Sequence, residues 1–167
     1  MIATALSFLA EEMNIYFSNK GKLTDDKVIV SALISQDSTI SIQGENKIVI
    51  TLINIEEDLK LKNQTVITRP HDRGTQPANI ILTVLFSAYF SPGNYTESLR
   101  FISFVISFFN ENPVFTMTAV LPPDPSIQRL SVEMVNADAQ KLHFTWTTLG
   151  AKYMPSVIYK VMIMPAV

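Results

Sequence analysis

The sequence predicts an α/β (α+β) fold in which a single mixed, largely antiparallel sheet of five or six strands packs with about three helices. Segments with apolar residues at helical spacing alternate with shorter segments that are rich in β-branched residues. The length of 167 residues suits one domain, 1–167, with one core. Only three charged residues, Glu97, Arg100 and Glu111, lie between positions 74 and 123, so we expect this part of the chain to be covered by the fold or by other subunits.

The first expected element is an amphipathic helix over residues 2–18. Its polar residues recur at spacings of three and four, which places them in one stripe along a helix. They are Thr4, Ser7, Glu11, Asn14 and Ser18, and the opposite stripe holds Ile2, Leu6, Leu9, Met13 and Phe17. Gly21 and the charged residues that follow it end the helix, and the β-branched run 28–34 predicts the first strand.

Two strands with apolar residues on both alternating faces are expected at the centre of the sheet. The first covers residues 47–55, after a short strand piece at 40–42, and the second covers residues 79–90. The segment between them, 60–78, reads as a loop. It is longer than the roughly 12 to 15 residues usual in compact domains, which makes it a candidate functional segment.

A second helix is expected after the turn that contains Pro92 and Gly93. Asn94 and Glu97 have the spacing of a capping box and predict its start. Apolar residues fill most of the helix circumference and leave one thin polar stripe, so we expect the helix to be buried on most sides. Pro113 ends it, because the residue before a proline is disfavoured in helical geometry.

The last third of the chain predicts a strand, a helix and a final strand. The proline-rich connector 121–126 leads into a half-exposed strand over residues 127–135. Asn136 is the expected N-cap of a helix over 137–149, with Asp138 in its first turn, and Gly150 suits its C-terminal cap. Residues 156–164 form the final strand.

Composition excludes several classes of function. A formal net charge of -2 provides no basic surface for a phosphate backbone, so we expect no nucleic-acid partner. The chain has no cysteine and therefore no disulfide or thiolate metal site. The longest apolar stretches, 80–90 and 101–109, are shorter than the roughly 20 residues of a membrane helix, so no membrane insertion is expected. The first ten residues lack the Lys or Arg of a signal peptide, which predicts synthesis in the cytoplasm.

Two groups of side chains offer chemistry, but neither makes a persuasive catalytic site. Glu56, Glu57 and Asp58 are adjacent, and in an extended chain neighbouring side chains point to opposite sides, so at most two can reach one cation. His71 lies in a polar loop beside Asp72 and Arg73, without an identifiable catalytic partner nearby in the sequence. We therefore expect no catalytic residue, no metal and no cofactor, and an enzyme that uses these groups remains a weaker alternative.

Several segments, taken in order, resemble one protein family. They are the opening helix at 1–6, the strand and acidic end at 48–58, the strand at 80–89, the helix at 99–109 with Asn112, Pro113 and Val114, and 146–150 followed by 156–161. Together they are similar to the N-terminal domain of the tail terminator, or cap, protein of phage-tail-like contractile injection systems. The resemblance covers nearly the whole chain and rests on the order and spacing of these segments.

The resemblance implies a structural protein with a phage tail-terminator-like fold. It implies a homo-oligomer, a hexameric ring that ends the inner tube and outer sheath and joins them in the assembled particle. It implies no cofactor and no catalytic residue. An adaptor or binding module that holds one partner through the 60–78 loop is the alternative from another class.

A closed ring needs two different, complementary patches on each subunit, and loops and chain ends are the expected places for them. We expect contacts from the 60–78 loop, the proline connector and the C-terminal residues 162–167, which project from the core or leave a strand edge for pairing. The specific interface candidates are Arg69, His71, Arg73, Pro122, Pro123, Met162 and Met164.

Overall fold

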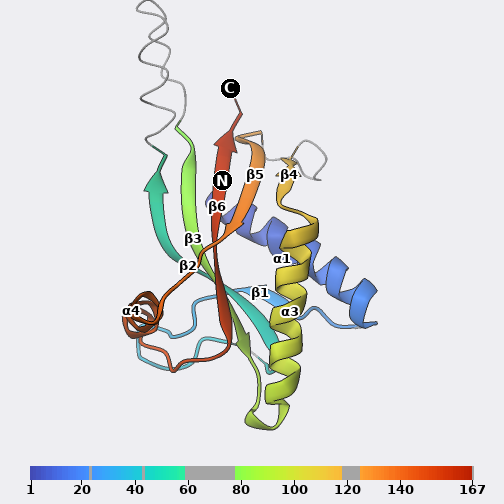
Figure 1. The fold of residues 1–167 in the computed structure, drawn as a ribbon, viewed down its shortest axis with the longest axis vertical. Coiled ribbons are helices and arrows are strands. Elements are labelled where there is room, and N and C mark those ends of the chain that lie inside the picture. Colours follow the sequence, from blue (N-terminus) through green and yellow to red (C-terminus); the bar gives the residue numbers. More distant parts are fainter. Residues whose placement is uncertain (23, 43, 59–77, 118–124, 167) are drawn as a thin grey trace, which may run out of the picture.

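Six strands form one twisted sheet in the order β1-β2-β3-β6-β5-β4, with helices on both of its faces (Figure 1). The computed structural model describes residues 1–22, 24–42, 44–58, 78–117 and 125–166. The strands are β1 Val28–Val30, β2 Lys47–Glu57, β3 Ile80–Tyr89, β4 Val114–Thr116, β5 Ile127–Met134 and β6 Ser156–Pro165. The helices are α1 Ile2–Gly21, the short 3-10 turn η1 Pro92–Asn94, α3 Tyr95–Glu111 and α4 Ala139–Leu149.

The predicted fold class is confirmed. β1 pairs with β2 in parallel, and the other neighbouring strands pair antiparallel, so the sheet is mixed and largely antiparallel. The six strands are not all the predicted ones. The 40–42 piece forms only an isolated bridge between Ile34 and Ile40, and the first strand stops at Val30. The sixth strand is β4, which the sequence analysis missed because three residues are too few for a recognisable alternation.

The main core lies between the sheet and the pair of helices α1 and α3, while α4 covers the opposite face (Figure 1). Aromatic rings join the layers of the main core. The ring of Phe109 on α3 lies 5.2 Å from the ring of Phe86 on β3 and 4.5 Å from the ring of Tyr159 on β6. The rings of Phe8 on α1 and Phe115 on β4 lie 5.5 Å apart. Edge-on contacts of this kind add about 0.5–1.5 kcal/mol each beyond area burial.

The second helix is less enclosed than its composition predicted. α3 buries Phe101, Val105, Phe108 and Phe109 against the core, but Leu99 is 43% exposed and other apolar residues along its flank are half-buried. A surface helix buries one face of its circumference, and the remaining apolar side chains then stay at the surface.

The predicted capping box at the start of α3 is wrong. Asn94 makes no side-chain cap to the helix, because its amide donates to Asn46 Oδ1 at 3.3 Å and to Ser91 Oγ at 3.1 Å. The side chain of Asn94 therefore ties the η1 turn to the start of β2. The helix is instead preceded by the 3-10 turn that Pro92 opens.

β2 is buried on both faces only in its first half. Its pairing with β3 shifts between Leu52 and Asn54, so Ile53 is an extra residue in the ladder. Such a bulge reverses which face each following side chain occupies. Beyond it, Asn54 and Ile55 are exposed, which corrects the expectation of a strand buried along its whole length.

Asn14 connects α1 to the outer edge of the sheet at β1. Its Oδ1 accepts hydrogen bonds from the backbone N–H groups of Lys27 and Val28, both at 2.8 Å, and its Nδ2 donates to the Val28 carbonyl at 3.0 Å. The sequence analysis placed Asn14 in a solvated polar stripe. In the structure, the Asn14 side chain makes three partly buried hydrogen bonds. They pair backbone groups of the edge strand as a neighbouring strand would.

Asn14→Ala should lower the free energy of unfolding by about 1–3 kcal/mol, because it leaves partly buried backbone donors without acceptors. Chemical denaturation measures the change. Ser7→Ala, at an exposed position of the same helix, is the matched control and should change stability by less than about 0.5 kcal/mol. Equal stability of the two variants would contradict the role given to Asn14.

Tyr159 brings a hydroxyl group into the main core. Its side chain is 2% exposed, and its hydroxyl has no hydrogen-bond partner within the described part of the chain. Burial raises the pKa of Tyr159 from 10.0 to about 12. The folded state therefore holds this proton more tightly than the unfolded chain does, so the contribution of Tyr159 to stability is constant below pH 10 and is lost as the pH rises toward 12.

Tyr159→Phe should keep or slightly raise the free energy of unfolding at pH 7, because it removes a buried hydroxyl without removing a described hydrogen bond. Above pH 10 the wild type should lose up to about 1.4 kcal/mol per pH unit more than the variant. Urea denaturation of both proteins between pH 8 and about pH 11 tests this, since other titrating groups contribute equally to both. Parallel pH profiles would contradict the prediction.

Candidate assembly surfaces

The predicted interface residues fall into two groups. Arg69, His71, Arg73, Pro122 and Pro123 lie outside the described residues, as does most of the 60–78 loop. Met162 and Met164 lie in β6 and are half-buried.

The structure corrects the reason given for the two methionines. β6 is an interior strand, paired with β3 from Ser156 to Ile163 and with β5 as far as Pro165. From Ser156 to Ile163 the strand therefore leaves no edge for pairing, while Met164 and Pro165 are paired on the β5 side. Met162 and Met164 instead point to the sheet face opposite α1 and α3, because they alternate with the core residues Val161 and Ile163.

These methionines belong to a surface that we call the open sheet face. Its members lie on neighbouring strands in register, on the face that carries α4 but away from the strand segments that α4 covers. They are Glu56, Ile81, Arg129, Glu133, Lys160, Met162 and Met164. The apolar members are half-buried and the charged ones exposed, so an apolar centre is surrounded by a polar rim.

Charge on the open sheet face is nearly balanced. The Lys160 Nζ lies 3.9 Å from the Glu56 Oε2, and Glu133 is directly opposite Lys160 in the ladder. All three side chains are exposed, so these contacts add little to stability. Their arrangement favours a contact surface for protein over one for a strongly charged ligand.

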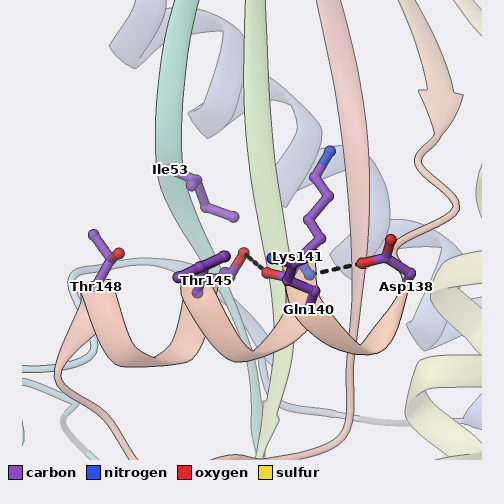
Figure 2. A pocket seen from close by; sticks show the side chains of 7 residues that line it. Ile53, Asp138, Gln140, Lys141, Thr145 and Thr148 are labelled. Carbon is purple, nitrogen blue, oxygen red and sulfur yellow. Dashed lines mark hydrogen bonds between the residues drawn. The ribbon is translucent and has the colours of Figure 1, made fainter.

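A shallow groove borders the open sheet face where α4 crosses the strands (Figure 2). Ile53 on β2 forms one side, and Lys141, Phe144, Thr145 and Thr148 line the helix side. Phe144 is 59% exposed. The Thr145 hydroxyl is already occupied within α4, where it donates a hydrogen bond to the Lys141 carbonyl at 2.8 Å. The groove therefore offers mainly apolar contact.

Asp138, and not the predicted Asn136, is the N-cap of the helix beside this groove. The Asp138 Oδ1 accepts from the Lys141 backbone N–H at 2.8 Å, as Figure 2 shows. The helix consequently starts at Ala139, two residues later than expected. Gly150 at the other end has φ 66°, which confirms its predicted role, because the left-handed region favours glycine.

A second apolar surface runs along the flank of α3, on the other side of the sheet. Tyr95, Leu99, Ile102 and Ile106 follow one another at spacings of four, three and four residues, which places them in one stripe. Tyr95 is 58% exposed and Leu99 43%, while the two isoleucines are half-buried. The molecule therefore has apolar surface on both sides of its sheet.

The side chains that the sequence offered for chemistry are only partly described, since His71, Asp72 and Arg73 lie outside the described residues. Glu56 and Glu57 alternate across the end of β2, as predicted, and the described chain contains no group of three His, Asp or Glu side chains placed to hold a metal ion. His143 is exposed on α4 next to Phe144, with 6.0 Å between the ring centres. In the same described part, no helix combines the length and the apolar character needed to span a bilayer.

The sheet with its three helices is a fold shared with a solved sheath/tube terminator and a solved tube-terminating cap. The chain belongs to the Pvc16 N-terminal domain family, whose model matches residues 4–166. This result confirms the family resemblance read from the ordered segments of the sequence.

Two solved structures share the fold. One is the PVC sheath/tube terminator of an extracellular contractile injection system in the extended state, at 17% identity and TM-score 0.52 over 93% of this chain and 55% of that one. The other is the tube-terminating cap of the anti-feeding prophage, at 16% identity and TM-score 0.53 over 95% of this chain and 53% of that one. The chain thus spans about half the length of each. A comparison with curated protein sequences finds no match.

Asp138→Ala should lower the free energy of unfolding by about 0.5–2 kcal/mol, since it removes the side-chain cap of α4. Asn136→Ala is the matched control, two residues upstream and also exposed, and should have almost no effect. Thermal denaturation of both variants distinguishes the observed cap from the one predicted by sequence. A larger loss for Asn136→Ala would contradict the assignment.

Proposed function

We propose that this chain is a structural subunit of a tail terminator in a contractile injection system. In this proposal, copies of the chain form a hexameric ring that stops the growth of the inner tube and outer sheath and ties the two together. The protein is made in the cytoplasm and becomes part of the assembled particle. Its partners are other copies of itself, tube subunits and sheath subunits.

The observation that carries the proposal is the family match over residues 4–166, together with a fold shared with a sheath/tube terminator and a tube-terminating cap. The two solved structures are named as a terminator and a cap, which supports a structural role over an enzymatic one.

The placement of apolar surface also supports assembly. Ring subunits meet through two different patches, and this chain has one on each side of the sheet. The open sheet face presents Ile81, Met162 and Met164, and the flank of α3 presents Tyr95 and Leu99. Methionine is flexible and polarisable, which suits a surface that contacts neighbouring subunits. In this proposal Met162 and Met164 keep the contact role that the sequence predicted. They make the contact through the open sheet face and not through a strand edge.

Molecular mass and particle shape test the ring. Light scattering coupled to size-exclusion chromatography should give about six times the 18.7 kDa subunit mass for the free protein. If the ring forms only on the tail, the complex with tube and sheath subunits should contain six copies of the chain. Electron microscopy of particles made without the protein should reveal tubes and sheaths of uncontrolled length. Normal particles without it would refute the proposed function.

Replacing both Met162 and Met164 by arginine should weaken ring formation about tenfold or more, because it places unpaired charge in the apolar centre of the open sheet face. The free energy of unfolding of the subunit should change much less than the free energy of ring formation, since both side chains are half-buried at the surface. Met134→Arg, on the opposite face of β5, is the matched control. Equal ring formation by all three proteins would remove the open sheet face from the interface.

A further inference from the structure

Two shallow grooves lie on opposite sides of the sheet. One is the groove along α4 described above, which we call the α4 groove. The other lies where α1 meets the segment that leads into β1, on the side of the sheet that α1 and α3 cover (Figure 1). We call it the α1 groove, and its lining residues are Glu11, Asn14, Ile15, Ser18, Asn19 and Asp26.

The α1 groove combines negative charge with an exposed apolar side chain. Its charged lining residues are Glu11 and Asp26, which are both exposed. Neither carboxylate forms an ion pair with another described residue. Ile15, one helical turn after Glu11, is 58% exposed, while the amide of Asn14 already binds the backbone at the start of β1. The groove therefore fits a partner surface that carries both a cation and an apolar group.

The α4 groove carries both of these groups. Lys141 and Phe144 lie one turn apart on α4, and both line the groove. Phe144 is 59% exposed, and the Lys141 ammonium group forms no ion pair within the described part of the chain. Asp138 also lines this groove, but its carboxylate caps the helix and faces the positive end of the helix dipole. The charge that remains for a partner is the cation of Lys141.

We propose that the α4 groove of one copy of this chain docks on the α1 groove of the next copy. Lys141 then lies between Glu11 and Asp26, and Phe144 packs on Ile15. A second copy is the occupant because the charges of the two grooves are complementary and each groove exposes a large apolar side chain. This inference rests on the proposed function, since it assigns an interface of the ring.

Contacts between like grooves are disfavoured. Two α1 grooves brought together would place four carboxylates in one contact, and two α4 grooves would place two lysines together. The charges therefore select the head-to-tail contact between unlike grooves. Because α1 and α4 cover opposite faces of the sheet (Figure 1), this contact joins each copy to the next in the same direction, as a ring requires.

The contact is continuous with the apolar surfaces of the proposed ring interface. The α4 groove borders the open sheet face. On the other side of the sheet, α1 packs beside α3, with 5.3 Å between the rings of Tyr16 and Phe108. The side that carries the open sheet face thus meets the side that carries the flank of α3. The grooves supply the charged contacts that fix the register between them.

Charge reversal tests this contact. Lys141→Glu should weaken ring formation about tenfold or more, because it brings like charges together. Glu11→Lys combined with Asp26→Lys should have the same effect. An equimolar mixture of the two proteins should form rings, since the α4 groove of each then matches the α1 groove of the other. Light scattering and electron microscopy measure the rings, or the copies retained on tails if the ring forms only there.

Two controls accompany the mixture. Lys141→Glu chains should stay out of rings formed by the wild type, whose α1 groove remains acidic. Lys152→Glu makes the same charge change at an exposed position that lines neither groove, and it should form rings normally. Normal ring formation by Lys141→Glu alone would overturn the proposal, and so would a mixture of folded variants that forms no rings.

Cross-linking provides a second test that leaves the charges in place and still decides if a charge variant fails to fold. The chain has no cysteine, so Asn19→Cys in the α1 groove and Thr148→Cys in the α4 groove introduce its only thiols. A flexible bismaleimide should convert rings of the double variant into a ladder of covalent oligomers of up to six copies, while each single-cysteine variant should stay monomeric. Rings of the double variant that yield only monomers, or single-cysteine variants that yield dimers, would overturn the proposal. Wild-type protein that neither forms rings nor caps tails would refute the proposed function instead.

Discussion

The structure depends on the aromatic packing between α3 and the sheet. Phe109 contacts both Phe86 and Tyr159, so a single side chain fixes the helix over the two central strands β3 and β6. Phe108 contacts Phe115 on β4, the edge strand two places from β6. Because α3 runs directly into Pro113 and β4, the position of the helix also sets the position of the edge strand. Close-packed aromatic rings tolerate little displacement, so a change in this core would also move β4.

The two faces of the sheet differ in how completely the helices cover them. The face under α1 and α3 holds the larger core, and Asn14 closes its β1 edge with bonds that would otherwise come from another strand. The opposite face is covered by α4 around Trp146, while Met162 and Met164 stay half-buried outside this cover. A domain of this size can leave part of one face uncovered, since the main core already buries most of its large apolar residues. In the proposed ring, this uncovered part would contribute to recognition more than to folding.

Much of the fold could be predicted because its central elements carry long, regular patterns. The helix at 2–18 and the strands at 79–90 and 156–164 appear nearly as predicted, since nine or more residues of consistent periodicity outweigh local preferences. The errors lie at positions where a single side-chain hydrogen bond determines the local structure. Asn94 has the spacing of a cap but bonds to Asn46, and Asp138 takes the capping role expected of Asn136. In the candidate site, Met162 and Met164 were predicted as contact residues because the C-terminal segment projects from the core or leaves a strand edge. Strand order places β6 inside the sheet, so these two side chains are available only through the sheet face.

The sequence by itself determined the fold class, the family resemblance and the expectation that apolar surface would be covered by assembly. The fold class and the expected coverage follow from composition and periodicity, and the family resemblance follows from the similarity of particular segments in their order along the chain. Tertiary structure alone decided which strands lie at the edges, which face α4 covers, and where the bulge at Ile53 turns the end of β2 outward. Strand neighbours are set by the packing of residues far apart in the chain, such as Phe8 against Phe115. No local pattern contains that information, so the candidate surfaces became visible only in the folded domain.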